Sequence, residues 1–296
     1  MKLYLFILLS CLSGGLFGQN PFEAVKTYDY TIKNVSFKSA DVNLSGSIFM
    51  PKYPKAGVAL VHGSGKETRM TKMAILLARQ GIAVITYDKR GVGESGGVYM
   101  GPEVGTNNID STNLNLLASD ASEALNVLLE RIHSKRIPIG LMGFSQAGWV
   151  IPLAAAKNQK IKYMVLFSGP VVSTLEQLRF QFYTNGNTKF WDAHTEAEAR
   201  EHMQSDPDKY KFEPTDPMNA LSKLTVPGLW IFGGKDIQAP VGLSIEHLDI
   251  LKAQGKPYHH QLFSELGHNT ASSSSPEPLS YAIRWIKSSA VFKRKK

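Results

Sequence analysis

The stretch Gly143-Phe144-Ser145-Gln146-Ala147-Gly148 joins two apolar segments. The residues before it, Ile137–Met142, have the pattern of a short buried strand, and Trp149–Ala156 after it have that of an apolar helix. Small residues are needed where a chain turns sharply from strand to helix, because the turn crowds the side chains. We therefore expect a tight turn that holds the Ser145 hydroxyl outward; the alternative is a turn that merely contains a serine.

Strand and helix patterns alternate around this turn and predict the fold class. Two antiparallel strands are expected first, at 28–37 and 44–50, followed by strands at 57–61, 82–87, 137–142, 163–167, 229–232 and 258–263. Helices are expected at 70–80, with Gly81 as its C-cap, and at 116–132, 146–157, 241–253 and 275–288, the last with Ser275 as N-cap and Pro276 in first position. This alternation predicts an α/β fold with a mainly parallel central sheet flanked by helices.

One segment interrupts the alternation. About sixty residues without a strand pattern separate Phe167 from Leu229, and they contain two capping-box patterns, Ser173–Glu176 and Thr195–Glu198. We expect a helical cap insertion at about 171–225 within a single domain that spans 19–296.

Chemically reactive residues follow several predicted strands, where parallel sheets place their functional sites. Ser145, Asp236 and His268 each follow a separate strand, in the order nucleophile, acid, base. A serine hydroxyl needs a histidine to accept its proton and an acid to orient that histidine. The alternatives are a turn aspartate at 236 and an ordinary loop histidine at 268, one of eight histidines in the chain.

An acyl-transfer site also needs hydrogen-bond donors for the oxyanion. The backbone N–H of Gln146, at the expected helix start, is one candidate. The backbone N–H of Ser64, within His62-Gly63-Ser64-Gly65, is the other. The alternative for this second segment is a glycine-containing turn without a role in catalysis.

The first eighteen residues resemble a secretory signal. A basic Met1-Lys2 precedes the apolar Leu3–Leu9, and small residues follow, which predicts a signal peptide at 1–18 and an exported, periplasmic or secreted protein. The alternative is a lipoprotein anchored at Cys11, the only cysteine. No stable membrane insertion is expected after signal removal, because the apolar run is too short to span a bilayer.

Composition excludes several other classes. The formal net charge is +8, but no basic stripe is interleaved with aromatic residues, so we expect no nucleic-acid partner. No metal-ligand cluster is evident, and we expect no metal and no cofactor. Gly91–Gly96 fits the glycine pattern of dinucleotide sites, but Val98–Pro102 follows it where a helix would have to begin.

Taken together, these motifs resemble the α/β-hydrolase superfamily, and more narrowly its exported bacterial esterase and serine aminopeptidase-like branch. The supporting segments are His62–Gly65, Asp88–Ser95, Gly143–Pro152, Gly234–Pro240 and Gly267–Asn269. The resemblance implies Ser145 as nucleophile, Asp236 as acid, His268 as base, a cap before Leu229, and a mainly structural loop at 88–95 with Asp88 and Arg90 in polar contacts. Ala147 stands where the family usually has glycine, which could narrow the turn.

The expected reaction is hydrolysis of a small-molecule carboxylic ester with a short acyl chain. A serine peptidase or amidase is the first alternative, with a substrate amine held by Glu176, Glu196 or Glu198, unless these simply line a solvated helix face. A non-catalytic binding module on the same fold is the second. The predicted cap carries apolar side chains that could form its own core or line a pocket: Leu178, Phe180, Phe182, Tyr183, Phe190 and Trp191.

Overall fold

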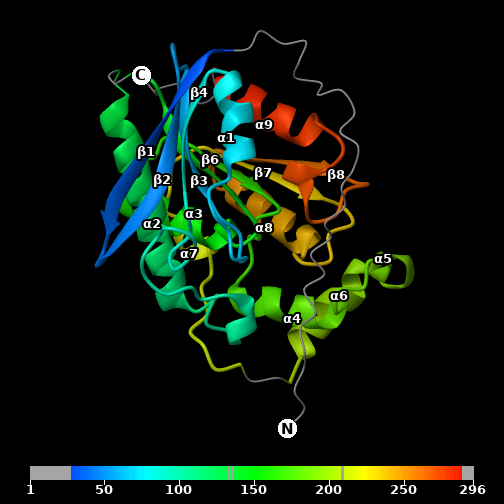
Figure 1. Cartoon of the computed structure of the whole chain (residues 1–296). Helices are drawn as coiled ribbons and strands as arrows, with labels where there is room; N and C mark the ends of the chain where they lie inside the picture. The colour runs from blue at the N-terminus through cyan, green and yellow to red at the C-terminus, as the bar shows by residue number, and fades with distance from the viewer. Residues whose placement is uncertain (1–27, 133, 135, 208–209, 289–296) are drawn as a thin grey trace.

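A single eight-stranded sheet runs through the computed structural model, with helices on both of its faces (Figure 1). The structure describes residues 28–132, 134, 136–207 and 210–288. The signal peptide predicted at 1–18 and the alternative anchor at Cys11 lie outside these residues.

The strand order is β1-β2-β4-β3-β5-β6-β7-β8. β2 pairs antiparallel with both β1 and β4, and all the other neighbouring strands are parallel. The strands are β1 (Tyr30–Ser39), β2 (Val42–Pro51), β3 (Ala56–Val61), β4 (Ile82–Tyr87), β5 (Ile139–Phe144), β6 (Met164–Phe167), β7 (Gly228–Gly233) and β8 (Tyr258–Phe263). The predicted fold class, a mainly parallel sheet after an antiparallel pair, is confirmed.

The central strands are buried on both faces, and their sequences explain why. Every residue of β3, β4, β6 and β7 is buried, and these strands consist almost wholly of apolar residues. Such uniform apolar runs suit parallel strands that are covered by helices on two sides. β8, at the sheet edge, has only one buried residue, Tyr258, and its other residues are partly or fully exposed.

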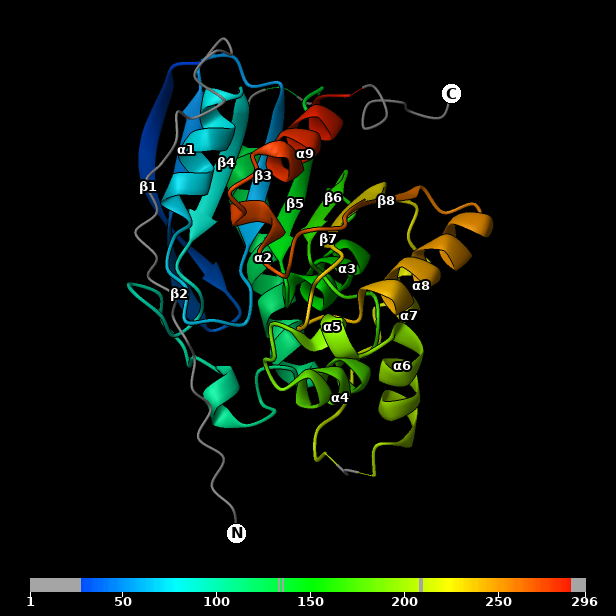
Figure 2. The ribbon, with the colours of Figure 1, turned by 90° about the vertical axis from the view of Figure 1, so that its right-hand side faces the viewer.

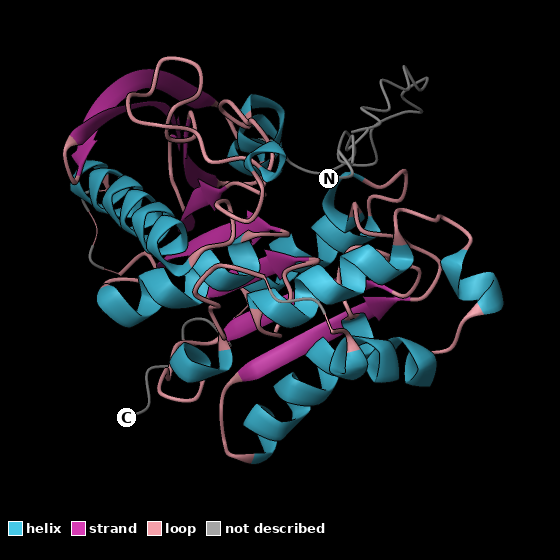
Figure 3. Cartoon of the chain, turned by 90° about the horizontal axis from the view of Figure 1, so that it is seen from below, coloured by secondary structure: helices cyan, strands magenta, loops and turns pink. Residues whose placement is uncertain are grey.

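The helices form two layers, which Figure 3 shows on either side of the strands. α1 and α9 pack with one face of the sheet in one apolar cluster, while α2, α3, α7 and α8 pack with the other face. The α-helices are α1 (Thr71–Arg79), α2 (Ser111–Arg131), α3 (Ala147–Lys157), α4 (Thr174–Thr184), α5 (Phe190–Ala193), α6 (Glu196–Ser205), α7 (Met218–Leu221), α8 (Val241–Ala253) and α9 (Glu277–Lys287), and two short 3₁₀ helices are η1 (Pro102–Val104) and η2 (Thr270–Ser272).

The structure corrects the predicted start of α2 and the predicted N-cap of α9. α2 begins at Ser111, not at 116, because the Asp110 side chain accepts a hydrogen bond from the Thr112 backbone and caps a polar first turn. A helix start that is read from the apolar periodicity therefore falls after this capped polar turn. α9 begins at Glu277 with Pro276 as N-cap, one residue later than predicted, although the Ser275 hydroxyl does accept from the Glu277 N–H at 3.3 Å.

The segment between β6 and β7 contains α4, α5, α6 and α7 and, in its described residues, no strand. Both predicted capping boxes are present, at the start of α4 and of α6. α4, α5 and α6 lie together at the lower end of the molecule in Figure 1 and Figure 2. We call residues 171–225 the inserted segment.

Candidate active site

Ser145 lies on a sharp turn between β5 and α3. Its backbone has a φ of 50°, in the left-handed region that residues with a side chain rarely adopt. Two hydrogen bonds hold the turn: the Ser145 N–H donates to the Phe167 carbonyl at 3.0 Å, and the Gly148 N–H donates to the Ser145 carbonyl at 2.8 Å. The turn therefore presents the half-exposed Ser145 side chain at the carboxyl ends of β5 and β6.

Small residues around Ser145 are required by close packing. A Cβ placed on Gly143 would lie 2.3 Å from the Cβ of Ala147, and one placed on Gly148 would lie 2.6 Å from the Pro170 nitrogen. Real atoms do not approach so closely, so neither glycine can be replaced without moving the backbone. Ala147, where the family usually has glycine, thus fits only because residue 143 has no side chain.

Asp236 and His268 are joined by a hydrogen bond. His268 Nδ1 lies 2.8 Å from Asp236 Oδ2. The other carboxylate oxygen, Oδ1, accepts from the backbone N–H groups of Gln238 at 2.7 Å and Ala239 at 3.0 Å. The Asp236 side chain is fully buried, so its own loop fixes one oxygen and leaves the other to orient His268.

Ser168, a residue that the sequence patterns did not single out, holds the backbone of His268. It follows β6 with a φ of 50°, and its hydroxyl donates to the His268 carbonyl at 2.6 Å and lies 3.1 Å from the Thr270 hydroxyl. His268 Nε2 is buried and makes no hydrogen bond to any described residue, Ser145 included. The ring is therefore anchored through Nδ1 and the backbone, while Nε2 remains available.

The two predicted oxyanion donors lie on segments next to Ser145. Gln146 is the N-cap of α3, so its backbone N–H has no partner within the helix. Ser64 lies in the loop after β3, and this loop runs close to Ser145: a Cβ on Gly63 would lie 3.7 Å from the Ser145 Cβ. The structure thus brings both donor segments to the turn that carries Ser145.

His62, at the start of the same loop, is buried and neutral. Burial, and then the nearby charge of Lys89, lower its pKa to about 3. Its ring packs edge-on against Tyr87, with 4.9 Å between the ring centroids. The loop therefore begins with an uncharged aromatic side chain inside the core.

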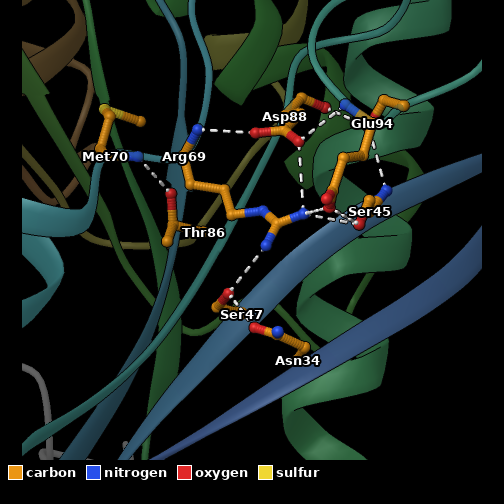
Figure 4. A network of polar contacts seen from close by, with 9 residues as sticks. Asn34, Ser45, Ser47, Arg69, Met70, Thr86, Asp88 and Glu94 are labelled. Carbon is orange, nitrogen blue, oxygen red and sulfur yellow. Dashed lines mark hydrogen bonds and ion pairs between the residues drawn. The ribbon is translucent and has the colours of Figure 1, made fainter.

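The loop at 88–95 is held by buried polar contacts, as the resemblance implied. Asp88 Oδ1 accepts from the Arg69 N–H at 2.9 Å, and Oδ2 accepts from the Glu94 N–H at 3.1 Å and forms an ion pair with the Arg69 guanidinium (Figure 4). Arg90 forms a buried ion pair with Asp120 of α2. These contacts attach the loop to the sheet and to α2.

The aromatic side chains of the inserted segment mostly pack against one another. Phe180 and Phe190 are buried in a separate cluster with Tyr183 and Trp191, while Phe182 is 44% exposed. Leu178 packs against the main core instead. These residues form the core of the inserted segment more than the wall of a pocket.

The inserted segment also binds the loop that carries Asp236. Trp191 Nε1 donates to the Asp236 carbonyl at 2.8 Å, and the Thr184 hydroxyl donates to the Ile237 carbonyl at 2.7 Å. The Gln177 side-chain amide donates to the Gln238 carbonyl. Three consecutive carbonyls after β7 are thus bound by α4 and α5, a connection that no sequence pattern indicated.

The three glutamates considered as anchors for an amine have other partners. Glu176 and Glu198 accept hydrogen bonds in the two capping boxes. Glu196 pairs with Arg200 one turn along α6. Each carboxylate therefore has a local structural role.

Within the described residues, no group of three or more His, Cys, Asp or Glu side chains could hold a metal ion. A search of the same residues for a helix long and apolar enough to cross a membrane also finds none.

The chain is similar to known hydrolases. The Hydrolase_4 family, described as serine aminopeptidase S33, matches residues 52–226, which is more than half of the chain and includes Ser145 but ends before Asp236. Esterase EstD of Thermotoga maritima is 26% identical over 234 residues, covering 69% of this chain and 53% of its own. The chain therefore spans about half the length of this curated relative.

Solved structures share the fold. An acylaminoacyl peptidase of Pyrococcus horikoshii superposes with a TM-score of 0.63 at 19% identity, covering 90% of this chain and 42% of its own. An esterase of Pyrococcus furiosus gives a TM-score of 0.62 at 19% identity, covering 92% and 95%. These likenesses establish the α/β-hydrolase fold, and the family match establishes that the chain belongs to the serine aminopeptidase S33 family of serine hydrolases.

Proposed function

We propose that this protein hydrolyses small carboxylic esters through an acyl-enzyme on Ser145. The observation that carries the proposal is the Asp236–His268 hydrogen bond, which leaves His268 Nε2 without a partner among the described residues, together with the strained turn that presents Ser145. An alcohol becomes a useful nucleophile only when a base removes its proton, and this arrangement supplies a base and the acid that orients it.

In the proposed reaction, His268 Nε2 accepts the Ser145 proton as Oγ bonds to the ester carbonyl carbon. The backbone N–H groups of Ser64 and Gln146 stabilise the oxyanion. The carbon–oxygen bond to the leaving alcohol then breaks, and His268 returns the proton to that alcohol. Water, deprotonated by His268, then attacks the acyl carbon. The bond to Ser145 Oγ breaks, His268 returns the proton to Oγ, and the acid leaves.

The inserted segment is proposed to act as a cap that limits the acyl pocket. Its large aromatic side chains are occupied mainly in its own core, which favours short acyl chains over long ones. Export through a leader at 1–18 is also proposed on the sequence pattern, with lipid anchoring at Cys11 as the alternative. N-terminal sequencing of the mature protein and metabolic palmitate labelling distinguish these two routes.

A peptidase or amidase of the same family is the second candidate, supported by the description of the family. The cap glutamates do not strengthen it, because capping boxes and Arg200 engage all three. A group elsewhere would have to bind the amine of a peptide substrate.

A substrate panel tests the proposal. A fluorophosphonate probe should label the native protein at Ser145, and p-nitrophenyl acetate or butyrate should be turned over faster than palmitate. Aminoacyl-p-nitroanilides, measured beside the esters, should be poor substrates. Faster turnover of the anilides would replace the esterase with the peptidase, and a folded protein with neither labelling nor turnover would favour a binding module.

A further inference from the structure

Lys89 is a buried lysine beside the predicted oxyanion hole. It follows β4 and is only 2% exposed. Its ammonium donates to the carbonyl of Gly63 at 2.6 Å, to the carbonyl of Gly65 at 3.3 Å, and to Oε1 of Gln146 at 3.1 Å. One side chain thus contacts both segments that carry the predicted oxyanion donors.

Tyr99 completes the set of contacts. Its hydroxyl donates to the Ser64 carbonyl at 3.2 Å, and its ring centroid lies 5.7 Å from the Lys89 ammonium. The carbonyls of Gly63, Ser64 and Gly65 are therefore all bound from the side of the loop where Lys89 and Tyr99 lie.

Peptide geometry links the Lys89 contact to the Ser64 N–H. The Gly63 carbonyl and the Ser64 N–H belong to one planar trans peptide unit, so they point in opposite directions. An ammonium on the carbonyl oxygen turns this N–H away from Lys89. Because the cation also draws electron density toward the oxygen, it makes the same N–H a stronger donor.

The neighbouring N–H of Gly63 is already used. It hydrogen-bonds to the carboxylate of Glu67. Burial raises the pKa of this carboxyl group, and the charge of Lys89 and then the Gly63 N–H oppose that shift. The N–H whose direction is set by the Lys89 contact is therefore that of Ser64. Gln146 is fixed in a similar way, since its side chain accepts from Lys89 and donates to the Asn108 carbonyl at 2.5 Å.

We propose that Lys89 is a positioning residue of the oxyanion hole: it orients and polarises the Gly63–Ser64 peptide and fixes Gln146, so that both backbone donors face the reacting carbonyl. The ammonium also places a positive charge in a buried region behind the developing oxyanion, where charge interactions are stronger than in water. This inference rests on the proposed function, because it requires an acyl-transfer site at Ser145.

The charge of Lys89 is poised to titrate near neutral pH. Burial lowers its pKa to about 8, while the carboxylates of Glu67 and Glu103 oppose this shift. The other titratable side chains around it are the neutral His62, Tyr99, and Tyr87, whose pKa is raised by burial. Loss of the Lys89 proton above about pH 8 removes the cation and with it the polarisation of the peptide.

The main experiment compares Lys89→Met with Lys66→Met, which removes the same charge from an exposed position in the loop after β3. Both are assayed with p-nitrophenyl acetate, with circular dichroism and unfolding midpoints as checks of folding. Lys89→Met should lower kcat roughly 10- to 100-fold with little change in KM, since only oxyanion stabilisation is weakened. Lys66→Met should match the native protein.

The pH profile separates a positioning role from a structural one. Native kcat should decline above about pH 8, and Lys89→Met should lack this decline. A Lys89→Met protein with native kcat, or a native profile that stays flat to pH 10, would overturn the inference. Tyr99→Phe, which removes only the hydrogen bond to Ser64, should lower kcat a few-fold. If Lys89→Met does not fold, a native kcat profile that stays flat to pH 10 overturns the inference by itself.

Fluorophosphonate labelling keeps the two proposals apart. Lys89→Met should still be labelled to full stoichiometry at Ser145, at a rate reduced in parallel with kcat. Absence of labelling in the folded native protein would contradict the proposed function itself. Full labelling of the native protein together with an unaffected rate in Lys89→Met would leave the proposed function standing and reject only the role of Lys89.

Discussion

Two loops at the carboxyl ends of the strands are held in the same manner by different parts of the chain. In the loop after β3, three consecutive carbonyls accept from Lys89 and Tyr99, which follow β4. In the loop after β7, three consecutive carbonyls accept from Trp191, Thr184 and Gln177 of the inserted segment. The first loop is bound partly by a buried charge, the second by neutral side chains.

The two loops differ in which part of the chain fixes their position. The α/β core fixes the loop after β3, and the inserted segment fixes the loop after β7. Lys89 belongs to the core, so the loop with the predicted oxyanion donors is fixed wherever the inserted segment lies. The loop with Asp236 is attached to α4 and α5, so a change in the inserted segment reaches the predicted acid directly. Four predictions test this division, beginning with the site that both loops serve.

Ser145→Ala should have the largest effect. Loss of the proposed nucleophile should lower kcat by about 10⁶-fold. The fold should be retained, because backbone hydrogen bonds hold the turn that carries Ser145. Steady-state turnover of p-nitrophenyl acetate and circular dichroism measure the two quantities. Native turnover in a purified Ser145→Ala protein would mean that the reaction takes place elsewhere. The two loops would then not support a common active site at Ser145.

Asp236→Asn should come next. The amide can occupy the same space but favours the wrong tautomer of His268, so kcat should fall by about 10⁴-fold with a modest change in KM. The pH dependence of kcat, with the unfolding midpoint as control, measures this. If kcat is unaffected, the acid lies elsewhere, and Asp249, which pairs with His260, is the next candidate.

Trp191→Phe should have an intermediate effect. It removes one hydrogen bond to the Asp236 carbonyl while keeping most of the aromatic packing, so we expect about a threefold to tenfold lower kcat and a loss of about 1 kcal/mol of unfolding free energy. Phe182→Ala, at a partly exposed position on α4, is the matched control and should leave kcat unchanged. Equal kcat in all three proteins would mean that the inserted segment does not position Asp236.

The smallest effect on activity at neutral pH, but a clear one on stability, should come from His62. Its folded-state pKa of about 3 lies below the unfolded value of 6.5, so the unfolded state binds more protons between these values. The free energy of unfolding should therefore fall as pH decreases from 6.5 toward 3. His62→Phe should flatten this dependence in urea unfolding from pH 7 to 4, and an unchanged slope would mean that other groups cause the acid sensitivity.

The turn at Ser145 could be predicted from the sequence, because it depends on a local pattern. The strand before the turn, the small residues within it and the helix after it are all adjacent in the chain. Asp236 and His268 could be chosen because each lies in the loop that follows a strand pattern. The hydrogen bond between these two side chains could be seen only in the folded structure.

The contacts that support these residues could not be predicted in the same way. Lys89 and Gln146 are 57 residues apart, and Ser168 and His268 are 100 residues apart. Such pairs depend on which strands become neighbours and on their register, which no single segment specifies. The start of α2 was missed for another reason, since the cap at Asp110 precedes the apolar periodicity used to recognise the helix.

The way the loop after β3 is held has a consequence for laboratory evolution. The Lys89 and Tyr99 contacts reach Gly63, Ser64 and Gly65 only through backbone oxygens. The side chain at position 64 is therefore free to vary without loosening that anchorage. Saturation mutagenesis at this codon should yield a high fraction of folded clones, with diversity placed on the loop that runs close to Ser145.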